Sequence, residues 1–216
     1  MSNMRILVRD LKLRLGEKLG PLGWRPVLDD EEEDYVSFVK RREGGLFSQV
    51  AVSFTVHDPG VSLNPSVGVG HEAASRLAAS FYGLPAGACA VGASLVELFE
   101  AEGREGGLLP RWMVVSDDEV AATVDLLILD LERFGFPFME GFLSLPDIVR
   151  HLESVGHSNF DLGNLAISYA ETGNVSDGEM TVEKMAVNAK SEPPFVAEQT
   201  LRFVASFRKH YRSLAS

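Results

Sequence analysis

Two periodicities of hydrophobic and polar positions divide the first part of the chain. Residues 5–19 place apolar side chains at helical spacing, and Gly20 with Pro21 follows the last of them. Residues 35–42 and 46–57 are instead rich in β-branched and aromatic side chains, and Glu-Gly-Gly joins these two runs. The pattern predicts an amphipathic helix followed by a β-hairpin.

The stretch after the hairpin has the pattern of a strand that leads directly into a helix. The sequence "VSLNPSVGVG", residues 61–70, predicts a third strand. Within it, Pro65 lacks the N–H donor of a sheet ladder and therefore indicates an edge position or a break. Residues 71–82 return to helical spacing, and Gly83 is a typical helix stop.

Signals for further elements follow after residue 110. Residues 111–115 predict a short strand, and Ser116 with Glu119 has the spacing of a capping box. The apolar residues that follow predict a long helix, buried on more than one side, that ends at Gly135. Ser144 and Pro146 mark the start of another, shorter helix.

The C-terminal third is dominated by helical patterns. "NLAISYAETGNVSDGEMTVEKMAVNAK" resembles a single tetratricopeptide unit, and a last helix follows Pro193 and Pro194. Because repeat arrays need about three copies to bury a continuous core, we expect a packed helical hairpin here and not a peptide groove. The predicted fold class is α+β: a small antiparallel sheet of three to four strands with helices over residues 1–143, then a helical region over 144–216. A single domain including both regions is the alternative.

Composition limits the classes of partner. The 216 residues have a formal net charge of −11, which repels phosphate backbones and anionic lipids, so we expect neither nucleic acid nor a membrane as partner. No apolar run approaches the ~20 residues of a membrane span, and Cys89 is the only cysteine, which leaves no intramolecular disulfide. These features predict a cytoplasmic protein.

Six consecutive acidic residues carry much of the negative charge. Such a run usually lies in solvent as a loop, and its functional alternative is the attraction of a basic partner protein. The run consists of Asp29, Asp30, Glu31, Glu32, Glu33 and Asp34.

The stretch "DPGVSLNPSVGVGHE" raises the question of a metal or anion site. Gly68 and Gly70 lack the third glycine of a dinucleotide fingerprint, so a close turn or bulge explains them better than an anion site. His57, His71 and Glu72 offer metal-ligating atoms, but neighbouring residues of a strand or helix point in different directions. We therefore expect no metal and no cofactor, and expect His71 to form a hydrogen bond at the helix start.

Three other candidates for chemistry also have structural explanations. Cys89 stands among small residues, as a nucleophile can, but equally as a buried small side chain does. Ser94 does not have the Gly-x-Ser-x-Gly spacing and is expected to cap a helix. Asp125 and Asp130 are five residues apart, which places them on different helix faces and predicts solvent exposure for both.

Large aromatic side chains near predicted connections are candidates for interface anchors. The candidates are Trp24 and Trp112, together with the phenylalanines at positions 136, 138 and 142. Most such side chains belong to a core, but an exposed group of them would bind a protein.

The order of several segments resembles that of a known group of proteins. "GWRPVLDDEEEDYVSFVKRREGG", an apolar strand pair, "VGVGHEAASRLAA" and "RFGFPFMEGFLSLPDIVRHL" follow one another over roughly the first two-thirds of the chain. This order is similar to that of small uncharacterised bacterial domains, some of which lie near polymorphic toxin systems as immunity-type proteins. The resemblance implies a sheet with packed helices and inhibition of a toxin by binding, with no catalytic residues to carry over.

These observations favour interaction over catalysis. We expect a non-enzymatic protein-binding or immunity-like module whose partner is a protein of basic character. The alternative is a small-molecule hydrolase or metal-dependent enzyme centred on His57, His71 and Glu72. A third alternative is a homodimer formed through an apolar patch on a twofold axis.

Overall fold

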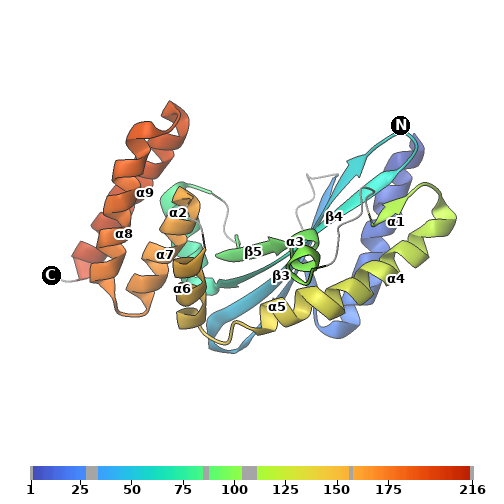
Figure 1. The fold of residues 1–216 in the computed structure, drawn as a ribbon, viewed down its shortest axis with the longest axis horizontal. Coiled ribbons are helices and arrows are strands. Elements are labelled where there is room, and N and C mark those ends of the chain that lie inside the picture. The colour runs from blue at the N-terminus through green and yellow to red at the C-terminus, as the bar shows by residue number, and fades with distance from the viewer. Residues whose placement is uncertain (1, 28–33, 85–87, 104–110, 156–157, 215–216) are drawn as a thin grey trace. The chain divides into compact units, whose positions relative to one another are not determined.

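The computed structural model describes residues 2–27, 34–84, 88–103, 111–155 and 158–214, and its chain forms two compact units (Figure 1). The first unit consists of Met1–Arg41, Ser48–Gly68 and Gly92–Gly141. The second consists of Arg42–Phe47, Val69–Val91 and Phe142–Ser216. Both units take chain from the predicted α+β region of residues 1–143, so the division does not follow one boundary along the sequence.

Strands of the described residues form a six-stranded sheet of order β1-β2-β3-β4-β5, in which β6 also pairs with β4. The α+β prediction is confirmed. The sheet has more strands than expected because β1 and β5, with three and four residues, are too short to show a period in the sequence. The strands are β1 Arg25–Val27, β2 Tyr35–Arg41, β3 Leu46–Val56, β4 Val61–His71, β5 Val91–Ser94 and β6 Met113–Val114.

The helices agree closely with the helical patterns of the sequence. None of those in the described ranges has the length and apolar character needed to cross a lipid bilayer. Their bounds are α1 Ser2–Leu19, α2 Glu72–Tyr82, α3 Leu95–Ala101, α4 Val120–Asp130, α5 Phe136–Glu140, α6 Leu145–Ser154, α7 Asn159–Glu171, α8 Val175–Asn188 and α9 Pro194–Leu214.

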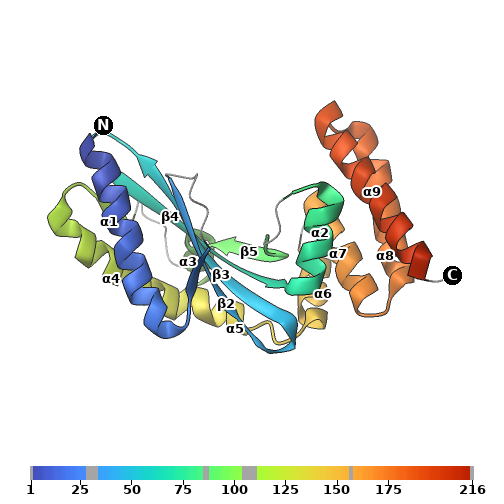
Figure 2. The same ribbon diagram turned by 180° about the vertical axis from the view of Figure 1, so that it is seen from behind.

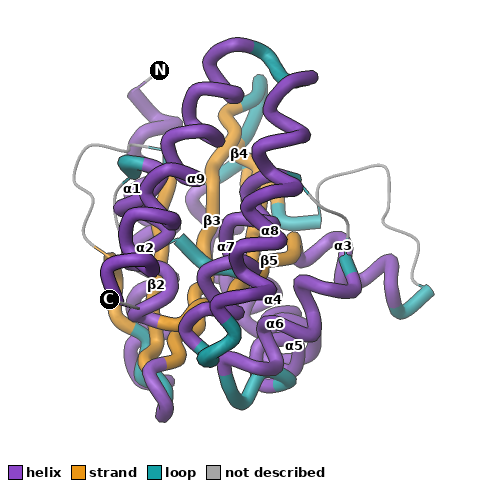
Figure 3. The backbone as a smooth tube through the Cα atoms, turned by 90° about the vertical axis from the view of Figure 1, so that its left-hand side faces the viewer, coloured by secondary structure: helices purple, strands orange, loops and turns teal. Residues whose placement is uncertain are grey.

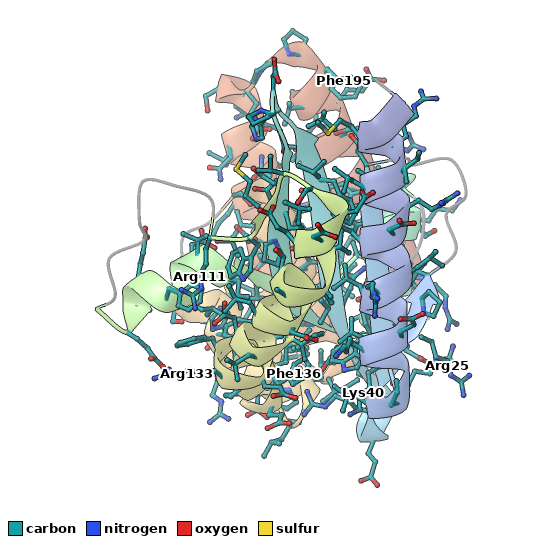
Figure 4. All side chains as sticks on the ribbon, turned by 90° about the vertical axis from the view of Figure 1, so that its right-hand side faces the viewer. Arg25, Lys40, Arg111, Arg133, Phe136 and Phe195 are labelled. Atoms are coloured by element: carbon teal, nitrogen blue, oxygen red, sulfur yellow. The ribbon has the colours of Figure 1, made fainter. Side chains whose placement is uncertain are left out.

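In the first unit, α1 and α4 lie side by side over one face of the strands (Figure 4). The ring of Phe38 on β2 passes 3.8 Å from the place where Gly16 of α1 would carry a Cβ atom. The ammonium of Lys12 lies 5.9 Å from the ring centroid of Phe54 on β3. Lys18 of α1 binds Asp125 of α4 with an N–O distance of 2.5 Å. The apolar face of the sheet is thus the one toward these helices.

The prediction that Pro65 marks a sheet edge or a break is wrong, because β4 is continuous and lies between β3 and β5. The N–H of Leu63 donates to Trp112 O beside β6, and the N–H of Ala90, just before β5, donates to Val69 O. Residues 63, 65 and 69 point their backbone polar groups to the same side, because these groups alternate along a strand. Pro65 therefore stands at the change from one partner strand to the next, where the missing donor costs least.

The entry and exit of α4 differ from the sequence pattern. Ser116 makes no side-chain capping bond, and the Glu119 carboxylate instead accepts a hydrogen bond from Val115 N at 2.7 Å. At the other end, Leu131–Gly135 is a π-helical segment that leads into α5. A Cβ on Gly135 would lie 3.0 Å from Val67 Cγ1, so the glycine allows the wider turn to approach β4.

In the second unit, α7 contacts α2, α6, α8 and α9, and α7 with α8 forms the expected helical hairpin (Figure 3). Two glycines bring these helices close together. Tyr82 of α2 packs against the backbone at Gly163 of α7. A Cβ on Gly178 of α8 would lie 2.8 Å from both Ala166 O and Phe207 Cζ. The rings of Tyr82 and Phe207 thus occupy the space that a side chain at Gly163 or Gly178 would fill.

Candidate functional site

One face of the sheet in the first unit differs in chemistry from the other. Successive residues of a strand point to opposite faces, so Phe38, Phe54 and Val67 share the face toward α1 and α4. Figure 2 shows β2, β3 and β4 beside α1 from behind. On each of these strands, the residues at the alternate positions belong to the opposite face. We call this second face the polar face: residues 35, 37, 39 and 41 of β2, 49, 51, 53 and 55 of β3, and 62, 64, 66 and 68 of β4.

The exposed and half-buried residues of β3 and β4 on the polar face are neutral. Ser53, Thr55 and Asn64 are exposed, and Gln49, Ala51 and Ser66 are half-buried. Arg41, at the end of β2, is the only charged residue at the described positions of this face. The chain as a whole is 24% charged, so about three charged residues are expected among twelve positions. Burial explains part of the difference, because Ser37, Ser62 and Gly68 are buried and charged side chains are rarely placed at buried positions.

Asn64 of β4 is held in a defined orientation on this face. Its side-chain amide donates to Thr55 Oγ1 at 3.0 Å and lies 3.5 Å from Ser53 O on the neighbouring strand. These contacts use the amide nitrogen and leave the carbonyl oxygen turned away from them. The geometry presents a fixed acceptor among hydroxyl groups that both donate and accept.

A buried hydroxyl lies next to this acceptor along β4. Ser62 is 2% exposed, and its Oγ has no hydrogen-bond partner among the described residues. Ser62 and Asn64 are two residues apart on one strand and so belong to the same face. A buried polar atom without a partner costs about 1–3 kcal/mol.

The structure does not bring the proposed metal ligands together. His57 precedes β4 and is exposed, whereas His71 is the last residue of that strand. The His71 ring accepts a hydrogen bond from Ala74 N at 3.5 Å and caps α2, which confirms its expected role at the helix start. Across the described ranges, no three His, Cys, Asp or Glu side chains are grouped as metal ligands.

The other candidate groups for chemistry have structural roles. Gly70 lets the ring of Phe47 approach the backbone, in agreement with a close contact and not an anion site. Ser94 caps α3 through a capping box with Glu97, as expected for a capping serine. Burial raises the pKa of the Cys89 thiol to about 12, so the thiol is protonated at neutral pH and unsuited to nucleophilic attack.

Both tryptophans proposed as interface anchors are buried. Trp24 is 5% exposed, stacks on Phe136 with ring centroids 5.5 Å apart, and has the Lys40 ammonium 6.0 Å from its ring. Figure 4 shows Lys40 and Phe136 at one end of the first unit. Trp112 is 2% exposed. Their burial argues against direct contact of either indole with a partner.

Trp112 belongs to a buried polar cluster that the sequence pattern missed. Asp130 is 2% exposed, which overturns its predicted exposure, whereas Asp125 is exposed as predicted. The Asp130 carboxylate accepts bonds from Arg111 Nε at 2.7 Å, Arg111 Nη2 at 3.0 Å and Trp112 Nε1 at 2.9 Å. The Arg111 guanidinium also lies over the ring of Phe99, 5.1 Å from its centroid. These bonds tie the β6 region to α4.

The acidic run falls mostly outside the described residues. Asp29, Asp30, Glu31, Glu32 and Glu33 lie outside them, and only Asp34 is described, exposed and with its carbonyl accepting from Phe54 N. The charge of the run is a property of the sequence alone.

Comparison with known proteins identifies no relative of the chain. No protein-family model, no curated protein sequence and no solved structure matches it.

The residues of the polar face carry a signal in the sequence that was not used. On β2, Tyr35, Ser37 and Val39 alternate with Val36, Phe38 and Lys40 of the opposite face. The same alternation continues as Ser, Thr, Asn or Gln at positions 49, 53, 55, 62, 64 and 66. Reading it across all three strands would have predicted a neutral polar face.

Proposed function

We propose that this chain is a non-enzymatic module that binds another protein of basic character, in the manner of an immunity-type protein. The observation that carries the proposal is the exposed part of the polar face, where Ser53, Thr55 and Asn64 present neutral hydrogen-bonding groups on an ordered sheet. Charged residues are depleted at the centre of protein interfaces, and polar residues form the rim.

The acidic run supports the choice of a basic partner. Six adjacent carboxylates in a chain of net charge −11 produce a field that attracts a cationic protein over several ångströms and raises the association rate. Steering of this kind needs no fixed geometry. The run therefore contributes to encounter, while an ordered face determines how long the complex lasts.

An enzyme centred on His57, His71 and Glu72 has less support. His71 uses its ring nitrogen to cap α2, and His57 is separated from it by the whole of β4. General acid–base or metal chemistry needs side chains within hydrogen-bonding reach of one reacting atom.

The test separates association from dissociation. The partner is co-purified from native lysate, identified, produced separately and measured by surface plasmon resonance at low and moderate salt. Changing all six residues of 29–34 to Asn or Gln is expected to lower the association rate constant about tenfold at low salt, with little change in dissociation.

The matched control changes exposed acids elsewhere, Glu132→Gln and Glu140→Gln, and is expected to have a much smaller effect. A purified chain that captures no protein, retains stoichiometric metal and loses that metal on His57→Ala would replace this proposal with the enzyme alternative.

A further inference from the structure

We propose that the second unit carries a docking surface for a second copy of this chain. The segment that it binds is residues 27–34 of that copy, in which the apolar residues Val27 and Leu28 precede the acidic run. The surface lies where α2 ends and where α7 and α9 begin. This inference goes beyond the proposed function and does not depend on it, because it needs no other protein.

The first part of the surface is a group of exposed apolar side chains. The structure describes all thirteen phenylalanines and both tryptophans of the chain, and of these only Phe160 and Phe195 are exposed. Phe195 has an exposed fraction of 69%, and Leu84, two residues after α2, is exposed as well. Exposed aromatic side chains are typical anchors of protein-binding surfaces, a role for which the buried tryptophans are unsuited.

Two hydrogen bonds hold these side chains in one region. Tyr82, the last residue of α2, donates to Asn159 O at 2.8 Å, and its ring stacks on Phe160 with centroids 5.7 Å apart. The Asn159 amide donates to Glu192 Oε1 at 2.6 Å, two residues before α9 begins. Figure 2 shows α2, α7 and α9 in the second unit, and all three helices contact one another. The exposed apolar side chains therefore lie around one meeting point of three helix ends.

The second part of the surface consists of two cations on α9, Arg202 and Lys209. Both are exposed, and their spacing of seven residues places them on one side of the helix, about 10 Å apart along its axis. The Arg202 guanidinium lies against the backbone at Gly83, beside the apolar group. None of the carboxylates in the described ranges forms a salt bridge with either cation, whereas Arg208 binds two glutamates of α8. The charge of these two side chains is thus available to an anionic segment.

The proposed segment has the same two parts in the same order. Val27 is exposed at the end of β1, Leu28 follows it, and six carboxylates come next. Six extended residues span at most about 20 Å, which exceeds the rise between Arg202 and Lys209. The apolar pair meets the exposed rings, and the carboxylates meet the two cations. Exposed ion pairs contribute little alone, so the contact needs both parts.

The chain supplies this complementary segment at the same concentration as the surface, which favours a second copy over an unrelated acidic protein. Net charge opposes the encounter, because two copies of charge −11 repel one another. Salt of about 0.1 M screens charges beyond roughly 10 Å and leaves contacts at shorter range. Self-association is therefore expected to be strongest near 0.1 M salt, and weaker at about 0.01 M and at about 1 M.

The first experiment uses a fluorescent peptide of residues 25–36 as the probe. It is titrated with the protein in which residues 29–34 are changed to Asn or Gln, so that the protein's own run does not compete. We expect saturable binding by fluorescence anisotropy at about 0.1 M salt. Phe195→Ala and Arg202→Gln are each expected to weaken it at least threefold. A peptide without its six carboxylates should not bind.

Three further variants make this titration specific. Glu198→Gln is expected to strengthen peptide binding about twofold, because Glu198 is an exposed acid four residues before Arg202 on the same side of α9. Leu13→Ala and Arg9→Gln remove an exposed apolar residue and an exposed cation of α1, and should change nothing. Absence of binding, or equal binding by the Phe195→Ala, Arg202→Gln and control proteins, would overturn the proposal.

The second experiment measures self-association of the full chain by sedimentation equilibrium. The parent chain is expected to associate, whereas two variants should be monomeric: the one with residues 29–34 neutralised, and the one with Phe195→Ser and Arg202→Gln. A mixture of the two is expected to form a heterodimer, because one supplies the surface and the other the segment. A mixture that stays monomeric, or association that neither variant reduces, would overturn the inference. Capture of a basic partner by a chain that does not self-associate would leave the proposed function standing without it.

Discussion

At the scale of single residues, Asp130 shows how one buried carboxylate organises its surroundings. Its three donors come from Arg111 and Trp112, the two residues directly before β6. The side chain of Asp130 is 4% exposed and that of Arg111 is 48% exposed, so the anion is the buried partner. Removing Arg111 is therefore expected to cost more than removing Asp130, because it leaves a buried carboxylate without its cation.

Arg111→Ala is expected to lower the unfolding free energy by about 3 kcal/mol, because the buried carboxylate keeps only the indole donor. Asp130→Ala is expected to cost less, about 1–3 kcal/mol, since Arg111 turns to solvent and only Trp112 loses a partner. Urea unfolding of both variants measures the difference. Arg150→Ala, which removes an arginine of an exposed ion pair with Asp147, is the control, with a change below about 1 kcal/mol. The reverse order of the two costs would show that Asp130 is not the buried partner.

Single residues were predicted well where the cause is local. His71 and Ser94 cap helices in the way that their position before a helical pattern implies. The burial of Asp130, which was expected in solvent, and of Trp112, a candidate interface anchor, was missed because the bond between them joins residues 18 positions apart. No local pattern contains such a contact, since it exists only after β6 and α4 have met.

At the scale of elements, close packing requires a glycine in one helix and not in another. Gly16 of α1 faces Phe38 at an ordinary contact distance of 3.8 Å, so it is not required by packing. Gly178 of α8 has Ala166 O and Phe207 Cζ where a side chain would lie. The helical pattern of the sequence treats both glycines alike, and only the neighbours distinguish them.

Gly16→Ala is expected to raise the unfolding free energy by up to about 1 kcal/mol, because alanine loses less backbone entropy in a helix. Gly178→Ala is expected to lower it by about 1–3 kcal/mol, since the added methyl group forces Phe207 from its place. Thermal or urea unfolding compares the two with the parent chain. Stabilisation by both substitutions would show that α8 does not pack closely on α7 and α9.

Elements were predicted correctly where they are long, as in α1, β2, β3 and β4. The error at Pro65 has a specific reason: the sequence shows the missing donor but not that β4 changes partners from β6 to β5 at this residue. The polar face was missed for a similar reason, because a face exists only when neighbouring strands are placed in register.

At the scale of the whole molecule, three tyrosines of the second unit are expected to make the protein less stable at high pH. Burial, then a hydrogen bond from Tyr169 to Glu153, raises the pKa of Tyr169 to about 12. Burial also raises the pKa of Tyr82 and of Tyr211, with nearby carboxylates adding to the effect. Each phenol is therefore held in its protonated form by the fold.

Stability is expected to be intact below pH 10 and to fall as pH rises from 10 through 12. Unfolded tyrosine loses its proton near pH 10, whereas the folded phenols keep theirs, so alkali favours the unfolded chain. Urea unfolding at a series of pH values, followed by circular dichroism, measures the fall. Tyr169→Phe is expected to reduce its slope. An identical slope in parent and variant would show that Tyr169 titrates normally.

The path of the chain through the two units has a consequence for dissecting the protein. β3 and β4 each begin in one unit and end in the other, so neither unit corresponds to a continuous stretch of the gene. A fragment ending at Gly141 would keep residues 42–47 and 69–91 but lose the helices α6 to α9 that complete their unit. A cut at a single point of the chain therefore cannot separate one complete unit from the other.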